Sequence, residues 1–147
     1  MWYALITIAV LVVSGLAFYA GQLLWKVKAQ EEAQKQEKSK KLTYITESVS
    51  HIAKAMHAKQ CEYSEGVLRI WVLLDHYNAA QTAPKDYKAL YPGFANLYEV
   101  VKDMPTHEAR KKFSKKEIFE MDTKRWDAEK EFEQQIETDL EVLLKEF

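Results

Sequence analysis

The first 25 residues contain no charged side chain, which constrains this chain more than any other feature of its sequence. A helix of that length would be roughly 37 Å long, against roughly 30 Å of bilayer hydrocarbon. Aromatic side chains favour the membrane–water interface, and they stand at both ends of the stretch, as Trp2, Tyr3 and Trp25. The sequence therefore predicts a transmembrane helix over residues 1–25, with the lipid bilayer as its partner.

The charges that flank the predicted span indicate its orientation. Lys26 and Lys28 follow it directly, at the expected membrane interface, and no Lys or Arg precedes it. Because segments rich in Lys and Arg stay inside, we expect the N-terminus outside and the C-terminal part in the cytoplasm. A cleaved signal peptide is the alternative, but the stretch lacks a basic N-terminal region. Ala17 and Gly21 are spaced as in helix–helix contacts, which leaves a homodimer open.

A charged helical stalk is expected over residues 26–41. The segment is rich in Ala, Gln, Glu and Lys, and it contains glutamate–lysine pairs four residues apart, such as Glu31–Lys35. An apolar stripe with helical spacing begins only afterwards, at Leu42, Ile45, Val49, Ile52 and Met56. Two heptads are few for a coiled coil, so we expect this stripe to pack into the core of a domain spanning residues 42–147.

The remainder of that domain is predicted to be helical, because Gly and Pro are scarce and no strand pattern stands out. Its expected elements are a helix capped by Ser64 that runs to about Asn78, a loop to Lys88, a helix opened by Pro92–Gly93, and a last helix after the capping box Ser114–Glu117. The apolar run 67–74 marks the first of these as a central buried helix. The predicted fold is all-α: an N-terminal transmembrane helix, a helical stalk and a small cytoplasmic helical bundle.

The densest polar patch of the chain is the segment Met104–Lys112. Its candidate partner- or ligand-binding residues are His107, Glu108, Arg110 and Lys111. Backbone N–H groups at the start of a helical turn capped by Thr106, together with the basic side chains, could hold an anion. The alternative is structural: His107 packs inside the domain, and Arg110 pairs with an acid of the last helix.

Arg69 is the second candidate, because it is a single guanidinium in an otherwise apolar helix. Glu65 lies one turn before it and Asp75 lies after it. An unpaired buried charge is strongly destabilising, so a buried Arg69 would require a carboxylate partner. We expect an ion pair that locks the helices together, with ligand binding by Arg69 as the alternative.

The composition argues against several other kinds of site. Cys61 is the only cysteine, which excludes an internal disulfide and a cysteine-based zinc site. The four histidines form neither a His-Glu-x-x-His motif nor repeated Glu-x-x-His pairs, so we expect no metal site and no cofactor. The basic segment 110–116 precedes a helix rich in acidic residues. We therefore expect pairing within the chain, and no nucleic-acid binding.

Five short motifs stand out in the domain: Cys61–Gly66, Val72–Asp75, Tyr91–Pro92, Leu97–Glu99 and Met104–Arg110. Through them the chain resembles an uncharacterised family of single-span gammaproteobacterial membrane proteins, a domain of unknown function whose most specific motif reads MPTHEAR. The resemblance implies the bacterial inner membrane and draws attention to Arg69, Asp75, His107, Glu108 and Arg110. It implies no activity.

The function we expect from the sequence is that of a membrane-anchored cytoplasmic adaptor without catalytic activity, which binds a cytoplasmic protein. A first alternative is a sensor of an anion or small ligand that uses Arg69, His107 and Arg110. That alternative requires Arg69 and Arg110 to lie close together, and it fails if they are far apart and each is paired with an acid. A second alternative is a metal-dependent enzyme built in a helical bundle.

Overall fold

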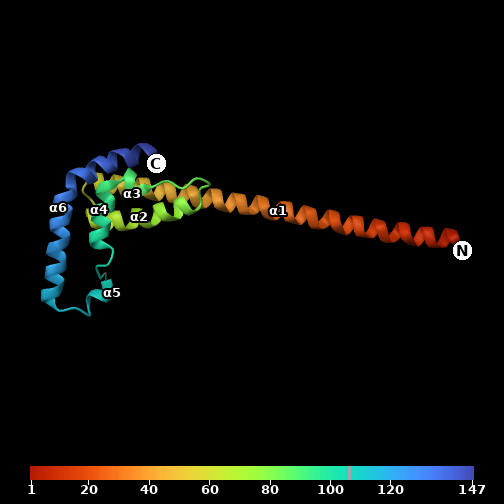
Figure 1. Cartoon of the computed structure of the whole chain (residues 1–147), viewed down its shortest axis with the longest axis horizontal. Helices are drawn as coiled ribbons and strands as arrows, with labels where there is room; N and C mark the ends of the chain where they lie inside the picture. The colour runs from red at the N-terminus through yellow and green to blue at the C-terminus, as the bar shows by residue number, and fades with distance from the viewer. Residues whose placement is uncertain (106) are drawn as a thin grey trace. The chain divides into compact units, whose positions relative to one another are not determined.

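The computed structural model describes residues 1–105 and 107–147, without the side chain of His107. Over these residues the chain is all-helical and contains no strand, which confirms the predicted class. The predicted Thr106 cap lies outside the described residues. In chain order, the helices are α1 (Trp2–His57), α2 (Tyr63–Ala79), α3 (Tyr87–Leu90), α4 (Pro92–Val101), α5 (His107–Arg110) and α6 (Lys115–Glu146) (Figure 1).

The chain divides into two compact units, Met1–Lys41 and Leu42–Phe147, which are described separately. The first unit is helical almost from its first residue, and its side chains are exposed. By length and composition α1 is a candidate membrane span, and none of its apolar window is buried inside the structure. The hydroxyls of Thr7 and Ser14 donate to backbone carbonyls three and four residues earlier, at 2.9 and 2.8 Å. Both hydroxyls are therefore satisfied within the helix and need no hydrogen bond from water. Polar groups inside a lipid bilayer have to be satisfied in this way.

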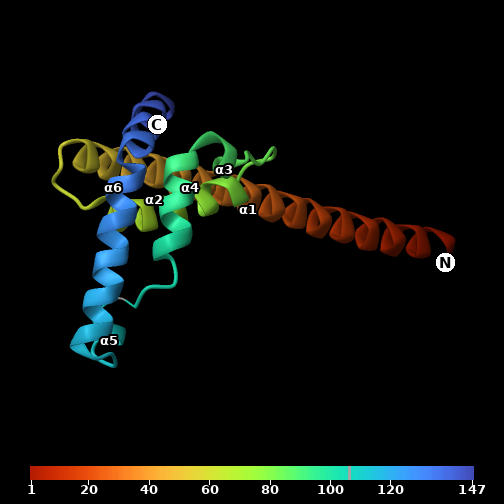
Figure 2. The ribbon, with the colours of Figure 1, turned by 60° about the vertical axis from the view of Figure 1, so that its left-hand side comes forward.

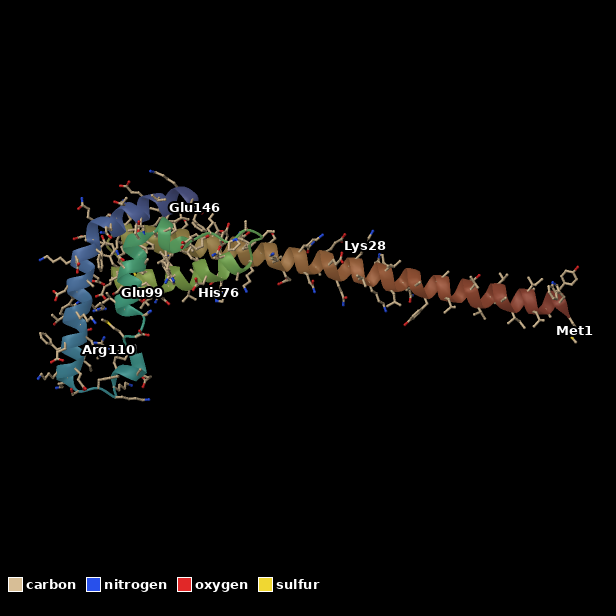
Figure 3. All side chains as sticks on the ribbon, in the orientation of Figure 1. Met1, Lys28, His76, Glu99, Arg110 and Glu146 are labelled. Carbon is tan, nitrogen blue, oxygen red and sulfur yellow. The ribbon has the colours of Figure 1, made fainter. Side chains whose placement is uncertain are left out.

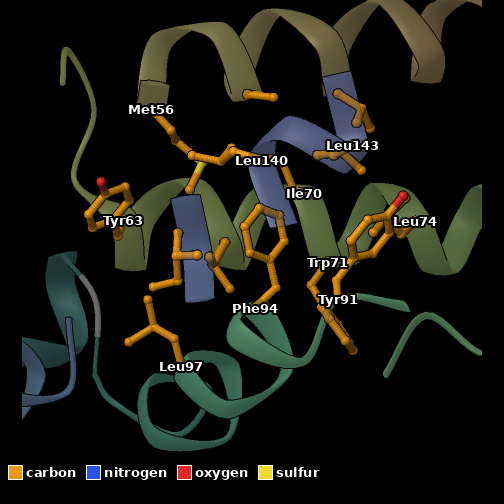
Figure 4. Packing of buried hydrophobic residues seen from close by; sticks show 14 of the residues in the cluster. Met56, Tyr63, Ile70, Trp71, Leu74, Tyr91, Phe94, Leu97, Leu140 and Leu143 are labelled. Atoms are coloured by element: carbon orange, nitrogen blue, oxygen red, sulfur yellow. The ribbon is translucent and has the colours of Figure 1, made fainter. Parts of the chain in front are cut away.

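The second unit begins with the C-terminal part of α1, whose apolar stripe packs into the core as predicted. Ile45, Val49 and Met56 are buried, while Leu42 and Ile52 are half-buried. Met56 lies against Gly66 of α2, and Figure 4 shows Met56 above the α2 helix.

Lys59 connects the end of α1 to α6. Its backbone has a φ of 55°, in the left-handed region that ends helices, and its ammonium lies 2.7 Å from Glu137 and 3.0 Å from Glu133. The Tyr63 hydroxyl of α2 bonds to both Lys59 and Glu137. These bonds hold the pKa of Glu137 below its usual range, chiefly through Lys59. Three helices are thus joined at one polar cluster.

α2 differs from the predicted helix at its start and on one side. Ser64, predicted as the N-cap, lies inside the helix and is buried, while the cap is Glu62, which makes no side-chain capping bond with the described residues. The Ser64 backbone N–H donates instead to the Glu129 carboxylate of α6, at 2.9 Å. Val72 is 51% exposed, so the helix predicted to be buried all round is buried on one side only. That buried side includes Val67, Ile70, Trp71 and Leu74.

The segment predicted as a loop ends in a short helix, α3. The Asp86 carboxylate caps it by accepting from the backbone N–H groups of Lys88 and Ala89, at 3.1 and 3.4 Å. Tyr87 is buried and its ring stacks on Tyr91, with centroids 5.9 Å apart. The burial of Tyr87 thus anchors α3 to the core. The polar residues around Tyr87 did not indicate this contact.

α4 opens at Pro92, as predicted, and packs mainly against α6, beside which it runs in Figure 2. A Cβ on Gly93 would lie 2.7 Å from backbone atoms of Gln135 and Ile136, so only glycine permits this approach of the two helices. The backbone N–H of Phe94 donates to the buried Asp139 carboxylate of α6 at 2.9 Å. A side chain of α6 therefore caps the start of α4.

α6 starts with the predicted capping box. The Ser114 hydroxyl accepts from the Glu117 N–H, and the Glu117 carboxylate accepts from the Ser114 N–H at 2.7 Å, which confirms the prediction. Further along α6, Leu140 and Leu143 are fully buried. Figure 4 shows Leu140 and the Phe94 ring of α4 pointing into the same core.

Candidate functional site

Three arginines from three helices line one pocket of about 380 Å³, which we call the arginine pocket. They are Arg69 of α2, Arg110 of α5 and Arg125 of α6. Arg110, labelled in Figure 3, lies close to the first half of α6. The remaining lining residues are Glu62, Ser64, Glu65, Leu68, Val101, Met104, Pro105 and Met121. The structure therefore brings Arg69 and Arg110 to one site, as the sensor alternative required.

Each arginine of the pocket also has a carboxylate partner. Arg110 makes a bidentate bond to Asp122 of α6, with nitrogen–oxygen distances of 3.0 and 2.6 Å. Arg125 donates to Glu62 at 2.7 Å, and its other terminal nitrogen lies 3.8 Å from Asp122. Pairing of Arg110 with an acid of the last helix confirms the structural alternative for that residue. The pocket is lined by cations that are paired but not saturated, since a guanidinium carries five N–H donors.

Arg69 corrects one prediction. Its side chain is 63% exposed rather than buried, because the apolar surface of α2 faces the core on one side only. Its partner is Glu65, one turn earlier in the same helix, at 2.5 Å. The expected ion pair between helices was therefore wrong, and this pair adds little to stability at such exposure.

The ion pair with Arg110 determines the protonation state of the Asp122 carboxylate next to the pocket. The Arg110 guanidinium holds the pKa of Asp122 below its usual value, with a smaller contribution from Arg125. The side chain of Asp122 is 19% exposed, so this pair is poorly screened by solvent. Asp122 is consequently ionised throughout the physiological pH range and keeps Arg110 in place.

Two polar atoms of the pocket residues lack a hydrogen-bond partner among the described residues. One is the hydroxyl oxygen of Ser64, whose residue is 2% exposed, and the other is Nε of Arg125. Buried polar atoms are normally paired, so these two are the most informative feature of the pocket. Sequence reasoning missed both residues as parts of a site: Ser64 was predicted as a helix cap, and Arg125 was not singled out. The position of Arg125 among apolar residues of the last helix was the signal that could have identified it as a candidate site residue.

The other predicted site residues do not join the pocket. Asp75 is exposed and is not among the residues that line it. Glu108 and Lys111 pair with each other at 2.7 Å and are highly exposed. The side chain of His107 lies outside the description. The predicted interface residues Trp2, Tyr3, Trp25, Lys26 and Lys28 are exposed in the first unit.

The described residues offer little other polar chemistry. Among them, no group of three or more His, Cys, Asp or Glu side chains is arranged to hold a metal ion. Cys61 is half-buried, and burial raises the pKa of its thiol, with a further contribution from Glu65. A raised thiol pKa lowers the fraction of reactive thiolate.

A second cavity, of about 770 Å³, runs between α1 and α2, and we call it the α1–α2 groove. Its α1 wall consists of Tyr44, Glu47, Ser48, His51 and Ile52, and its α2 wall of Leu68, Arg69, Val72 and Leu73. The side chains of Tyr44 and Val72 are 67% and 51% exposed, so both add apolar surface to the walls of the groove. The groove is thus an apolar surface bordered by polar groups.

The fold and its cavities define a class of protein: an all-helical chain with a candidate N-terminal membrane span and a helical domain that carries an arginine pocket and an apolar groove. The profile of the family described as "Protein of unknown function (DUF2489)" matches residues 13–143. An uncharacterized protein of Haemophilus influenzae is 38% identical over 146 residues, covering 99% of this chain and 95% of that protein. The chain therefore belongs to the DUF2489 family. No solved structure matches it.

Proposed function

We propose that the chain is a membrane-anchored adaptor that binds an amphipathic helix of a cytoplasmic protein in the α1–α2 groove. In this proposal residues 1–25 cross the bacterial inner membrane with the N-terminus outside, residues 26–41 form a stalk, and residues 42–147 form the cytoplasmic binding domain. The uncharged stretch and the lysines that follow it support this topology. The groove is the observation that carries the proposed activity.

The composition of the groove suits a helix with one apolar face. Ile52, Leu68 and Leu73 are half-buried and pack against the core, so they offer a preformed apolar base. Tyr44 and Val72 extend the apolar surface into solvent. A helix that inserts apolar side chains at i, i+3, i+4 and i+7 would cover such a surface.

The charged residues at the border of the groove favour one orientation of the charges on the bound helix. Glu47 stands on the α1 wall and Arg69, which is paired with Glu65, stands on the α2 wall, so each wall carries a charged group of opposite sign. A partner helix with a basic residue toward α1 and an acidic residue toward α2 would complement both. Charged borders of this kind select partners more than they add affinity.

The exposure of Val72 allows an estimate of the binding free energy that its burial would contribute. Burial of a large aliphatic side chain stabilises by about 1.5–3 kcal/mol, and Val72 is 51% exposed, so covering it would contribute roughly 1 kcal/mol. A glutamate at this position would lose that term and would place a charge in an apolar contact. Val72→Glu should therefore weaken the complex at least about tenfold.

In-cell photo-crosslinking of the full-length chain tests the proposal, with a photoreactive phenylalanine at position 72 and a matched control at position 142. Val142 is 43% exposed, similar to Val72, but lies on α6 and does not line the groove. We expect one protein adduct from position 72, mapped by mass spectrometry to an amphipathic helix, and none from position 142. Co-purification of that protein should be lost in Val72→Glu and retained in Val142→Glu.

Three outcomes would contradict the adaptor. Equal adducts from both positions would mean that the contact is unspecific. An adduct to a second copy of this chain would make the groove a homodimer contact. A partner that co-purifies equally well with Val72→Glu would bind elsewhere.

A further inference from the structure

We propose that the arginine pocket binds a small organic carboxylate, with the carboxylate held by the arginines and a short apolar body against the pocket wall. This goes beyond the adaptor function, because it concerns another class of ligand in another cavity, which shares only Leu68 and Arg69 with the α1–α2 groove. The pocket is formed by residues at the start of α2, at and after the end of α4, and on α5 and α6.

Two unpaired donors identify where the head group binds. Arg125 uses a terminal nitrogen on Glu62, at 2.7 Å, while its buried Nε has no partner among the described residues. The Ser64 hydroxyl also has no partner among the described residues, and Ser64 is 2% exposed. Its backbone N–H, in contrast, donates to Glu129. Both groups are donors, and a carboxylate has two acceptor oxygens. A ligand that accepts from both would remove the unfavourable burial of unpaired polar atoms.

The other two arginines supply positive charge with donors to spare. Arg110 directs two nitrogens at Asp122 and is 34% exposed, and Arg69 directs one at Glu65 and is 63% exposed. Each guanidinium has five N–H donors, so each retains some for a ligand. Because arginine stays charged at all physiological pH values, the complementary head group is an anion.

The local balance of charge favours a monoanion over a dianion. Three carboxylates, Glu62, Glu65 and Asp122, accompany the three guanidiniums at the site. A phosphate group would bring up to two negative charges near these carboxylates, whereas a carboxylate brings one. A singly charged carboxylate therefore meets less repulsion at this site than a doubly charged phosphate.

The rest of the pocket indicates an apolar body of limited length. Leu68, Val101, Met104, Pro105 and Met121 line it. Its volume of about 380 Å³ lies toward the small end of ligand pockets, which span about 300–1,000 Å³. A chain of a few carbon atoms behind the carboxylate would contact these side chains, and hexanoate has this form.

Equilibrium dialysis of radiolabelled hexanoate against the full-length chain in lipid nanodiscs tests the proposal, with empty nanodiscs as the blank. We expect saturable binding of one hexanoate per chain, displaced by unlabelled hexanoate and not by hexanol. Inorganic phosphate should compete more weakly than hexanoate. These comparisons separate carboxylate recognition from simple apolar partition and from general anion binding.

Ser64→Ala is the decisive variant, because the hydroxyl it removes makes no hydrogen bond with the described residues. Its thermal unfolding midpoint should equal or exceed that of the parent chain, while its hexanoate affinity should fall about tenfold. Arg125→Lys keeps the charge but lacks Nε, and it should also bind more weakly. Lys111→Ala is the matched control, since Lys111 is 71% exposed and does not line the pocket.

Four results would overturn the proposal. They are the absence of saturable binding to the folded chain, displacement by hexanol as effective as by hexanoate, stronger competition by phosphate, and an unchanged affinity in Ser64→Ala. None of these results bears on crosslinking at position 72, so the adaptor proposal stands or falls separately.

Discussion

The contact between α4 and α6 at Gly93 yields a quantitative prediction. A Cβ at this position would lie 2.7 Å from the Gln135 carbonyl carbon and from the Ile136 nitrogen. Carbon atoms pack best at about 3.5–4.0 Å, so Gly93→Ala must separate the helices by roughly 1 Å. Both atoms belong to the backbone of α6, which cannot rotate away as a side chain would. The whole start of α4 therefore has to move.

That movement breaks a buried hydrogen bond. The Phe94 N–H donates to Asp139 at 2.9 Å, and an added ångström would take the pair beyond hydrogen-bond range. Overpacking costs about 1–3 kcal/mol and an unsatisfied buried group about 1–3 kcal/mol, whereas alanine gains about 1 kcal/mol in helix propensity. We expect Gly93→Ala to lower the free energy of unfolding by about 2–4 kcal/mol.

Urea unfolding of the full-length chain in nanodiscs, followed by near-ultraviolet circular dichroism, measures this loss. Trp71 is a suitable reporter, because it is buried and stacks on Tyr98 of α4 with centroids 5.1 Å apart. Gly21→Ala is the control, since no atom of the described residues lies within 4 Å of a Cβ there, and the urea midpoint should not fall. If Gly93→Ala unfolds at the same urea concentration as the parent, the close approach of α4 and α6 is not required and the reasoning is refuted.

Two further predictions concern polar groups that are buried or half-buried. Because Arg110 lowers the pKa of Asp122 below its ordinary 3.8, their pair should stabilise the fold above about pH 4 and lose this effect as the pH falls further. Urea midpoints measured against pH should fall less steeply toward acid in Asp122→Asn, and parallel curves would contradict this. Tyr91→Phe should cost about 1 kcal/mol, because the hydroxyl bonds to Glu146 at 2.6 Å. Tyr87→Phe should be neutral or stabilising, because its buried hydroxyl has no partner among the described residues. Equal losses of stability in the two variants would refute this distinction.

The candidate site was predictable only in part. Arg69 and Arg110 were identified because a charge in an apolar helix and a dense polar turn are visible in the chain itself. That both line one pocket depends on how α2 and α5 lie in the bundle, which no local pattern encodes. Arg125 lies on the partly buried face of α6, where its role depends on Glu62, 63 residues away.

Local signals in the sequence determined the helical elements. The uncharged stretch, the stripe from Leu42 to Met56, Pro92 as a helix start and the capping box at Ser114 each involve residues within a few turns of one another. Their physics is that of a single helix: length, periodicity and the satisfaction of its first N–H groups. Such features can be predicted before any packing is known.

Tertiary structure decided everything that requires two helices to meet. Asp139 caps α4 from α6, Glu129 accepts the Ser64 N–H in place of a local cap, and Val72 stays exposed in a helix that looked wholly buried. In each case a distant element competed with a local pattern, and burial with good hydrogen-bond geometry outweighed it. The reason is physical, because a side chain is buried or paired according to what packs against its helix, and the helix alone does not specify that neighbour.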